Sequence, residues 1–249
     1  MFISNVVFTW EPYTESLSDT RDDWAHPYSY FRHSEKLLSG TPEKHSLIDV
    51  ISNLKRAVDH RIRHISTIYK IKKTSIYTSK KTIWDILAEL EVIKPVMLAN
   101  LLEIRNAVEH KYSDPPTQTR CIELAEFVWY FLRSTDPLAK QVSDGPFLKE
   151  SYDSPFKIYY NGNPENEWES NITALLPKKL TSLTPKADYF EVSETTVQSG
   201  GDYKFALSKF RASISEMYNH FGDDDFIIIG KLKDRNIELW FLRLYFRKT

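Results

Sequence analysis

The stretch Leu101–Tyr112, with the sequence LLEIRNAVEHKY, decides how the first half of this chain is interpreted. At about 100° per residue, four apolar residues fall on one side of a helix through this stretch: Met97, Leu101, Ile104 and Val108. Arg105 lies inside this apolar arc. Because an unpaired buried charge is costly, the Arg105 guanidinium must be paired, hydrogen-bonded or in contact with a ligand. The simplest partner is Glu109, about one helical turn away.

Length and composition indicate a folded protein of one large or two small domains. The chain has 249 residues, of which 41% are hydrophobic and 14% aromatic, enough for a packed core. The formal net charge is −1, so nucleic-acid binding would depend on local basic patches. Cys121 is the only cysteine, which excludes an intrachain disulfide. We find no secretory signal and no apolar run near the roughly 18 residues of a membrane span, so we expect a cytoplasmic protein with no membrane partner.

The distribution of glycine divides the chain into three expected parts. No glycine occurs between Gly40 and Gly145, and this stretch has the apolar periodicity of helices, so a helical domain is expected over residues 41–138. Residues 1–40 mix aromatic and polar side chains and are interpreted as an N-terminal arm. Residues 139–249 carry strand and turn signals. The expected fold class is therefore α+β, with a helical bundle followed by a β-rich α+β C-terminal domain.

Apolar spacing, with threonine and proline near the helix ends, predicts four helices in the helical domain: Thr41–Lys70, Thr82–Lys94, Val96–Lys111 and Thr117–Arg133. The first is expected to carry basic residues on its polar face: Lys55, Arg56, Arg61 and Arg63. His60 and His64 have the i,i+4 spacing that can bind zinc, but no third ligand is evident, so a solvated basic face is favoured and no metal or cofactor is expected. On the fourth helix, Trp129 and Tyr130 exceed what one buried face needs, which indicates a dimer or interdomain contact.

A basic connector, Lys70–Lys81, joins the first two helices. Its sequence, KIKKTSIYTSKK, holds five lysines around Tyr77. A loop of this kind can contact phosphates while the aromatic ring stacks on a base. We therefore expect RNA contacts from four of these lysines: Lys72, Lys73, Lys80 and Lys81. The alternative is a solvated loop that is basic without binding a ligand.

In the C-terminal part, the residue pattern predicts strands at three places: Phe156–Tyr160, Ile172–Leu176 and Tyr189–Val192. Tyr203–Phe221 has the apolar spacing of a helix. At the end of the chain, Phe226–Leu232 and Ile237–Phe246 are rich in apolar residues and flank a polar turn. This arrangement predicts a β-hairpin.

The residues of the opening stretch also match a known signature. Arg105, Asn106 and His110 fit the pattern Arg-Asn-x3-His, and with Tyr112 the match extends to Arg-x4-His-x-Tyr. This motif, late in the third of four expected helices, resembles that of HEPN domains, four-helix proteins that include many metal-independent ribonucleases. The resemblance covers roughly residues 41–138. The longer form resembles the HEPN toxins that are paired with minimal nucleotidyltransferase antitoxins.

The resemblance implies an up-and-down four-helix bundle and assigns roles to the motif. His110 would act as acid or base, Arg105 would stabilise phosphate, and Asn106 would support them. Arg105 and His110 are separated by about 140° around one helix, so a single helix does not aim both side chains at one point. The resemblance implies the remedy, because HEPN domains form homodimers in which two motifs line a shared cleft. Part of the apolar arc around Arg105 would then face the partner.

These inferences lead to one main expectation and two alternatives. We expect a toxin-like, metal-independent endoribonuclease of microbial stress response or phage defence, with RNA as substrate and an antitoxin or another defence-system protein as partner. In the paired toxins the corresponding tyrosine receives a nucleotidyl group, so Tyr112 is either such a modification site or an aromatic cap on its helix. One alternative is a non-catalytic HEPN module that binds nucleotide or RNA, or that mediates protein assembly. The other is a structural adaptor in which Arg105 and Glu109 form a surface ion pair.

Overall fold

The computed structural model describes the whole chain except residues 15–16, 20–21, 111–112, 144, 200–224 and 248–249. It describes the backbone alone at positions 14, 17–19, 22, 97–98 and 109–110. The chain forms two compact units: residues 1–17 with 143–245, and residues 18–142 with 246–249. The interpretation of residues 1–40 as an arm is therefore wrong, because the two halves of this segment belong to different units.

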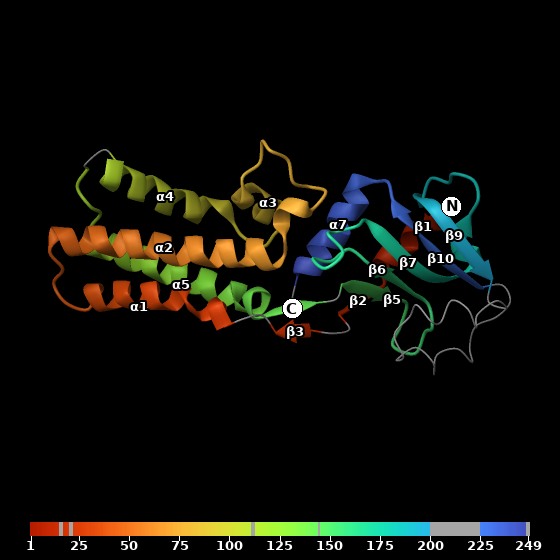
Figure 1. Ribbon diagram of the computed structural model, residues 1–249, viewed down its shortest axis with the longest axis horizontal. Helices are drawn as coiled ribbons and strands as arrows, with labels where there is room; N and C mark the ends of the chain where they lie inside the picture. Colours follow the sequence, from red (N-terminus) through yellow and green to blue (C-terminus); the bar gives the residue numbers. More distant parts are fainter. Residues whose placement is uncertain (15–16, 20–21, 111–112, 144, 200–224, 248–249) are drawn as a thin grey trace. The chain divides into compact units, whose positions relative to one another are not determined.

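The helical unit is built around α2, which lies between α1 and α4 and also packs against α5 (Figure 1). Its helices are α1 Pro27–Leu38, α2 Lys44–Ile68, α3 Ile83–Glu89, α4 Pro95–His110 and α5 Gln118–Lys140. Helices α2 to α5 occupy the four places that the apolar spacing predicted. Thr82 and Thr117 cap α3 and α5 by accepting hydrogen bonds from backbone N–H groups of the first turn. The stripe of α2 that is buried in the core includes Val50, Leu54, Ala57 and Ile65.

Helix α1 is the part of the supposed arm that belongs to the helical unit. Pro27 stands at its start, where the missing N–H leaves no hydrogen bond unmade. Phe31, Ser34 and Leu38 are buried at helical spacing, and the Ser34 hydroxyl donates to the carbonyl of Val50 on α2 at 3.3 Å. In the sequence, arginine, histidine and glutamate stand between these buried positions, and the stripe itself is narrow. The stripe was therefore too weak to predict a helix.

The expectation that Arg61 lies on a polar face of its helix is wrong, because its side chain is fully buried. One terminal nitrogen of its guanidinium donates to the carbonyl of Leu132 at 3.1 Å and to the hydroxyl of Thr135 at 3.2 Å. The other donates to the carbonyl of Trp24 at 3.1 Å and to the carboxylate of Asp136 at 2.8 Å. The buried charge is thus neutralised and hydrogen-bonded, which is the condition for burying it.

The same carboxylate explains why α5 is longer than expected. Asp136-Pro137 was read as the start of a linker, yet α5 continues through it to Lys140. Asp136 is buried and accepts a hydrogen bond from the hydroxyl of Tyr28 at 3.0 Å, besides its ion pair with Arg61. These contacts hold the last turns of α5 against α2 and α1. They outweigh the loss of one backbone hydrogen bond at the proline.

The second unit is an antiparallel sheet on which helix α7 packs. Within the described residues, eight strands follow the order β2-β5-β6-β7-β10-β9-β1-β8 (Figure 1). Their bounds are β1 Phe2–Ser4, β2 Glu11–Thr14, β5 Pro146–Lys149, β6 Lys157–Tyr160, β7 Asn171–Pro177, β8 Thr181–Ser182, β9 Tyr189–Ser199 and β10 Asp225–Leu232. The α+β class is confirmed, together with the strands predicted at β6, β7, β9 and β10. The helix predicted at Tyr203–Phe221 lies outside the described residues.

The two units meet in the chain within a pair of short strands, β3 (Leu17–Asp19) and β4 (Gln141–Ser143). These strands form a two-stranded sheet of their own. The boundary that the linker signals placed near residue 139 therefore lies close to where the chain leaves the helical unit. The N-terminal boundary, at residue 17, was not anticipated.

Helix α7, Arg235–Phe246, replaces the second strand of the expected terminal hairpin, so that prediction is wrong. Its buried side chains recur at helical spacing: Glu238, Phe241, Leu242 and Tyr245. The carboxylate of Asp234 accepts a hydrogen bond from the N–H of Asn236 at 2.8 Å, as a helix N-cap does. The Phe241 ring stacks on Tyr160 of β6 with 5.3 Å between centroids. The apolar residues of this segment fit both periodicities, and packing on the sheet selects the helix.

We predict that Asp136→Asn destabilises the protein by about 3–5 kcal/mol, because it leaves the Arg61 charge buried without its carboxylate. Urea unfolding followed by circular dichroism measures this change. Asp59→Asn is the matched control, since Asp59 forms a partly exposed i,i+4 ion pair with Lys55 and should cost under about 0.5 kcal/mol. Equal stability losses for the two variants would contradict the central place given to Asp136.

Candidate active site

Arg105 stands on the face of α4 that points into the helical unit. Leu101 and Val108, which precede and follow it by about one turn, are buried, and Arg105 itself is half-buried. Its guanidinium donates to the side-chain oxygen of the exposed Asn106 at 3.1 Å. The half-buried position of Arg105 agrees with its predicted place within the apolar arc. Its hydrogen bond to Asn106 was not predicted.

The remaining motif residues are described less fully. His110 is the last residue of α4, and its backbone alone is described. The same holds for Glu109, so the proposed ion pair between Glu109 and Arg105 stays a prediction. Tyr112 lies outside the described residues. The structure thus brings Arg105 and Asn106 together, and the relation of His110 to them stays a prediction.

Helix α4 carries more apolar surface than its own unit covers. It packs mainly against α2, and of its described apolar side chains only Leu101 and Val108 are buried. Leu102 and Ile104 are half-buried, and Val96 is 70% exposed. A helix that is apolar on most sides and only partly covered is typical of an interaction surface.

The basic connector is a loop held at the end of α2 by buried side chains. Ile71, Thr74 and Ile76 point inward and anchor it. Three of the four predicted RNA-binding lysines are exposed: Lys72, Lys73 and Lys80. The fourth, Lys81, forms an ion pair with Glu89 of α3. Most lysine side chains of this loop are therefore exposed to solvent, as expected both for an RNA-binding loop and for a basic loop that binds no ligand.

The structure does not bring these lysines to the motif on α4. The connector follows the C-terminal end of α2 and lies beside α3, at one end of the helical unit (Figure 1). Helix α4 begins at that end and runs away from it, so the C-terminal half that carries Arg105 lies toward the opposite end. An RNA strand that touched both within one chain would have to follow the length of α4.

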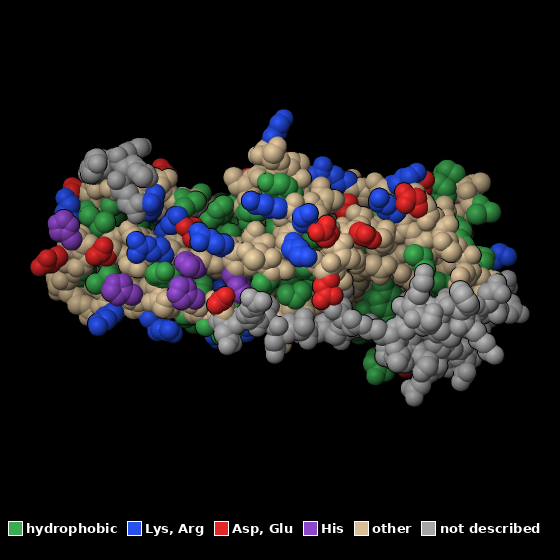
Figure 2. Space-filling view, in the orientation of Figure 1, with side chains coloured by type: hydrophobic (Ala, Val, Ile, Leu, Met, Phe, Trp, Pro, Cys, Tyr) green, Lys and Arg blue, Asp and Glu red, His purple; other side chains and the backbone are tan. Residues whose placement is uncertain are grey.

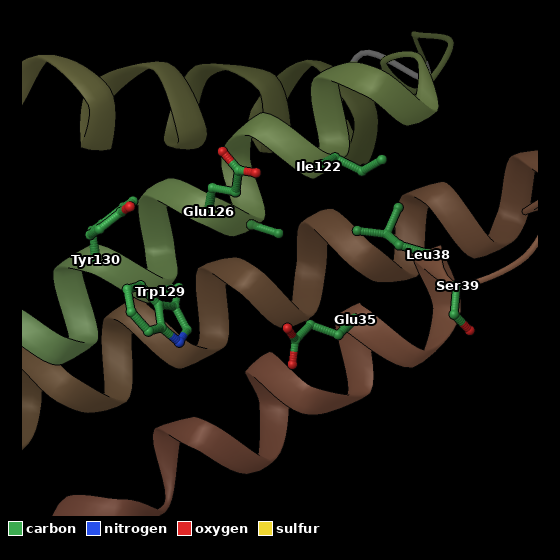
Figure 3. Close-up of a pocket in the computed structure, with 8 residues that line it drawn as sticks. Glu35, Leu38, Ser39, Ile122, Glu126, Trp129 and Tyr130 are labelled. Atoms are coloured by element: carbon green, nitrogen blue, oxygen red, sulfur yellow. The ribbon is translucent and has the colours of Figure 1, made fainter.

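The surplus aromatic residues of α5 line an open groove between α5 and α1 (Figure 3). The groove has a volume of about 510 Å³, and its apolar lining is exposed at Ile122, Trp129 and Tyr130, the last by 66%. Glu35 of α1 and Glu126 of α5 add two carboxylates to its lining. Helix α5 therefore carries a second apolar face, which forms this groove together with α1. The dimer or interdomain contact expected for this face stays a prediction.

A pocket lined by histidines is the feature that the sequence analysis missed. Six residues line it, and we call it the histidine pocket: Asp23, His26, His60, Arg63, His64 and Thr67. Its volume is about 390 Å³. The rings of His26 and His60 lie 4.9 Å apart, and Tyr30 lies 5.2 Å from His60. Only recognition of α1 as a helix packed on α2 would have revealed that these rings meet.

Electrostatics in this pocket disfavour the charged form of His60. Its pKa is lowered, first by burial of the ring and then by the neighbouring His26 and Arg63. His64 is held at its Nε2, which lies 3.0 Å from the carbonyl oxygen of Ala139. Among the described residues, no group of three or more metal-binding side chains is placed to hold a metal ion.

Comparison with protein-family models, curated proteins and solved structures finds no match for this chain. A search of the described helices finds none with the length and apolar content needed to cross a membrane. Three surfaces in the helical unit are therefore the candidates for a function. These are the Arg105 face of α4, the groove between α1 and α5, and the histidine pocket.

The lowered pKa of His60 predicts a pH-dependent stability. An unfolded histidine binds a proton near pH 6.5, and folded His60 binds it only at lower pH, so protons favour unfolding as the pH falls below about 6.5. Unfolding free energies measured between pH 8 and pH 5 should fall more steeply for the wild type than for His60→Gln. Exposed His45 provides the control, because His45→Gln should leave the slope unchanged. Identical slopes for all three proteins would contradict the assignment.

Proposed function

We propose that this protein is a metal-independent endoribonuclease of the HEPN type, acting in microbial stress response or phage defence. In this proposal α2 to α5 correspond to the four HEPN helices and α1 is an addition to them. The single observation that carries the proposal is a half-buried arginine on the partly covered helix α4, hydrogen-bonded to the asparagine that follows it in the motif. The adaptor alternative instead explains the charge of Arg105 by an ion pair with Glu109, so it predicts that Arg105→Ala changes little.

The proposed chemistry requires three groups at the scissile phosphate. One group must take the proton of the 2′-hydroxyl, another must protonate the leaving 5′-oxygen, and a cation must stabilise the crowded phosphate. Arg105 supplies the permanent charge and a fork of donors that fits phosphate oxygens. Asn106 limits the rotation of that fork through the 3.1 Å hydrogen bond. His110 is the titratable group of the motif, and an imidazole can both accept and donate a proton near neutral pH.

A second copy of the chain completes this site in the proposal. Two motifs can supply two histidines and two arginines if α4 of one protomer faces α4 of the other. Leu102, which is half-buried and lies about 60° from Arg105 around the helix, is part of what such a contact would bury. The groove between α1 and α5 is less suitable for this purpose, because α2 separates α1 from α4 (Figure 1).

We predict that the wild type cleaves single-stranded RNA in the presence of EDTA and that both motif variants lose this activity. His110→Ala should lower the rate about 10²–10⁴-fold through loss of acid–base catalysis. Arg105→Ala should lower it about 10²–10³-fold through loss of phosphate stabilisation. The measurement is initial cleavage of a labelled RNA of mixed sequence by each purified protein.

His33→Ala is the matched control for that experiment, because His33 is an exposed histidine on α1, which α2 separates from α4. It should retain wild-type cleavage. Equal cleavage by the wild type and both motif variants would remove the ribonuclease proposal. RNA binding without turnover, unchanged in His110→Ala, would instead favour the non-catalytic binding module.

We also predict that Leu102→Glu converts a wild-type dimer into a monomer, because it places a charge in the proposed α4 contact. Sedimentation velocity at several protein concentrations measures the change. Leu183→Glu is the control, since Leu183 is 84% exposed in the sheet unit and should leave the association state unchanged. A wild type that stays monomeric, or a Leu102→Glu variant that stays dimeric, would contradict the α4 contact.

A further inference from the structure

The histidine pocket gathers groups from two elements of the helical unit and from the residue that joins one of them to α1. The 3-10 turn Asp22–Ala25 supplies Asp23, His26 follows that turn directly, and α2 supplies the other lining residues. On the face shown in Figure 2, histidine side chains gather among lysines and arginines over α1 and α2. None of these residues belongs to the motif on α4. The pocket is therefore a candidate for a second, separate site.

Arg63 gives this pocket a permanent positive charge. It is exposed and forms no ion pair with any residue that the structure describes. The nearest acid on its own helix, Asp59, is engaged by Lys55. Asp23 is the one carboxylate that lines the pocket, and its negative charge disfavours binding of an anion there. A guanidinium without a carboxylate partner is suited to bind an oxyanion, above all a phosphate.

The rings beside Arg63 add protonatable donors and stacking surfaces. His26, Tyr30 and His60 form a cluster in which each pair of ring centroids is 4.9–5.3 Å apart. His26 is exposed, and His60 and Tyr30 are half-buried, so the edge of the cluster is open to a ligand. Histidine and tyrosine rings stack on unpaired bases, while an adjacent cation contacts the backbone phosphate.

We propose that the histidine pocket binds a phosphodiester group of a single nucleic-acid strand, with Arg63 as the fixed cation and His60 and His26 as donors that engage when protonated. This proposal does not depend on the ribonuclease activity. Binding at this pocket strengthens as the pH falls, because protonation of the histidines adds positive charge beside the phosphate. The bound anion in turn favours the protonated form of His60, which the pocket alone disfavours.

The pH dependence arises from the whole environment of His60. Charged and titratable groups face it from its own helix, from α1 and from the preceding turn: Asp59, Arg63, His64, His26, Tyr30 and Asp23. Arg63 and His26 oppose protonation, and Asp59 favours it. Asp23 is the group whose removal should help an anion. Asp23→Asn is therefore expected to strengthen binding.

The test uses the deoxydinucleotide dTpT, which carries one phosphodiester of constant charge and has no 2′-hydroxyl for a ribonuclease to use. Binding is measured on the full chain by NMR, as shifts of histidine ring protons, at pH 5.5 and pH 8. We expect tighter binding at pH 5.5. Arg63→Ala should weaken binding about tenfold, as loss of a hydrogen bond between charged groups does. His60→Gln should reduce the difference between the two pH values.

Arg56→Ala is the matched control, because Arg56 is exposed on α2 two turns from Arg63 and does not line the pocket. It should bind dTpT as the wild type does. Thymidine, which lacks the phosphate, should bind at least about tenfold more weakly than dTpT. Equal binding of thymidine and dTpT, equal losses for the two arginine variants, or no pH dependence in the wild type would each overturn the proposal. Failure of RNA cleavage would not affect it.

Discussion

The helical unit depends on one buried ion pair, between Arg61 of α2 and Asp136 of α5. Taking two charges out of water is costly, and the cost is met only because the guanidinium also donates to Leu132, Thr135 and Trp24. Through these contacts a single side chain connects α2, the end of α5 and the turn before α1. The hydrogen bond from Arg61 to Trp24 also brings His26, two residues after Trp24, close to α2. There its ring lies against the ring of His60, the residue before Arg61. The histidine pocket is thus a consequence of the buried pair.

Helix α4 differs from the rest of this unit in how it is held. The core helices α1, α2 and α5 bury whole stripes of apolar residues, whereas α4 buries Leu101 and Val108 and leaves Leu102 and Val96 more exposed. The proposed ribonuclease site lies on this least covered helix. Partly covered apolar surface of this kind is typical of an interaction surface. In the proposed function, a second chain covers it.

Sequence reasoning located α2 to α5 and the inward position of Arg105, because long apolar periodicity is a strong local signal. It failed where tertiary contacts decide. Arg61 stands at the spacing of the buried stripe of α2, between Ala57 and Ile65, but its charge suggested a solvated face. The sequence did not show that Asp136 of a distant helix pairs with it. The apolar residues of α7 fit the spacing of a strand as well as that of a helix. Packing of Phe241 on the sheet favours the helix. The histidine pocket joins residues of α2 and of the segment before α1, so no single stretch of sequence could reveal it.

The central functional claim is that two copies of α4 meet, so that both Arg105 motifs line one cleft. Pulsed electron resonance between spin labels tests it most directly, with one label per chain at Glu103→Cys, an exposed position on α4. Glu126→Cys in the α1–α5 groove is the comparison, and both variants also carry Cys121→Ser so that each chain has one label. The account predicts a shorter distance between chains for labels at 103 than for labels at 126. The absence of any coupling between chains, or a shorter distance at 126, would contradict it.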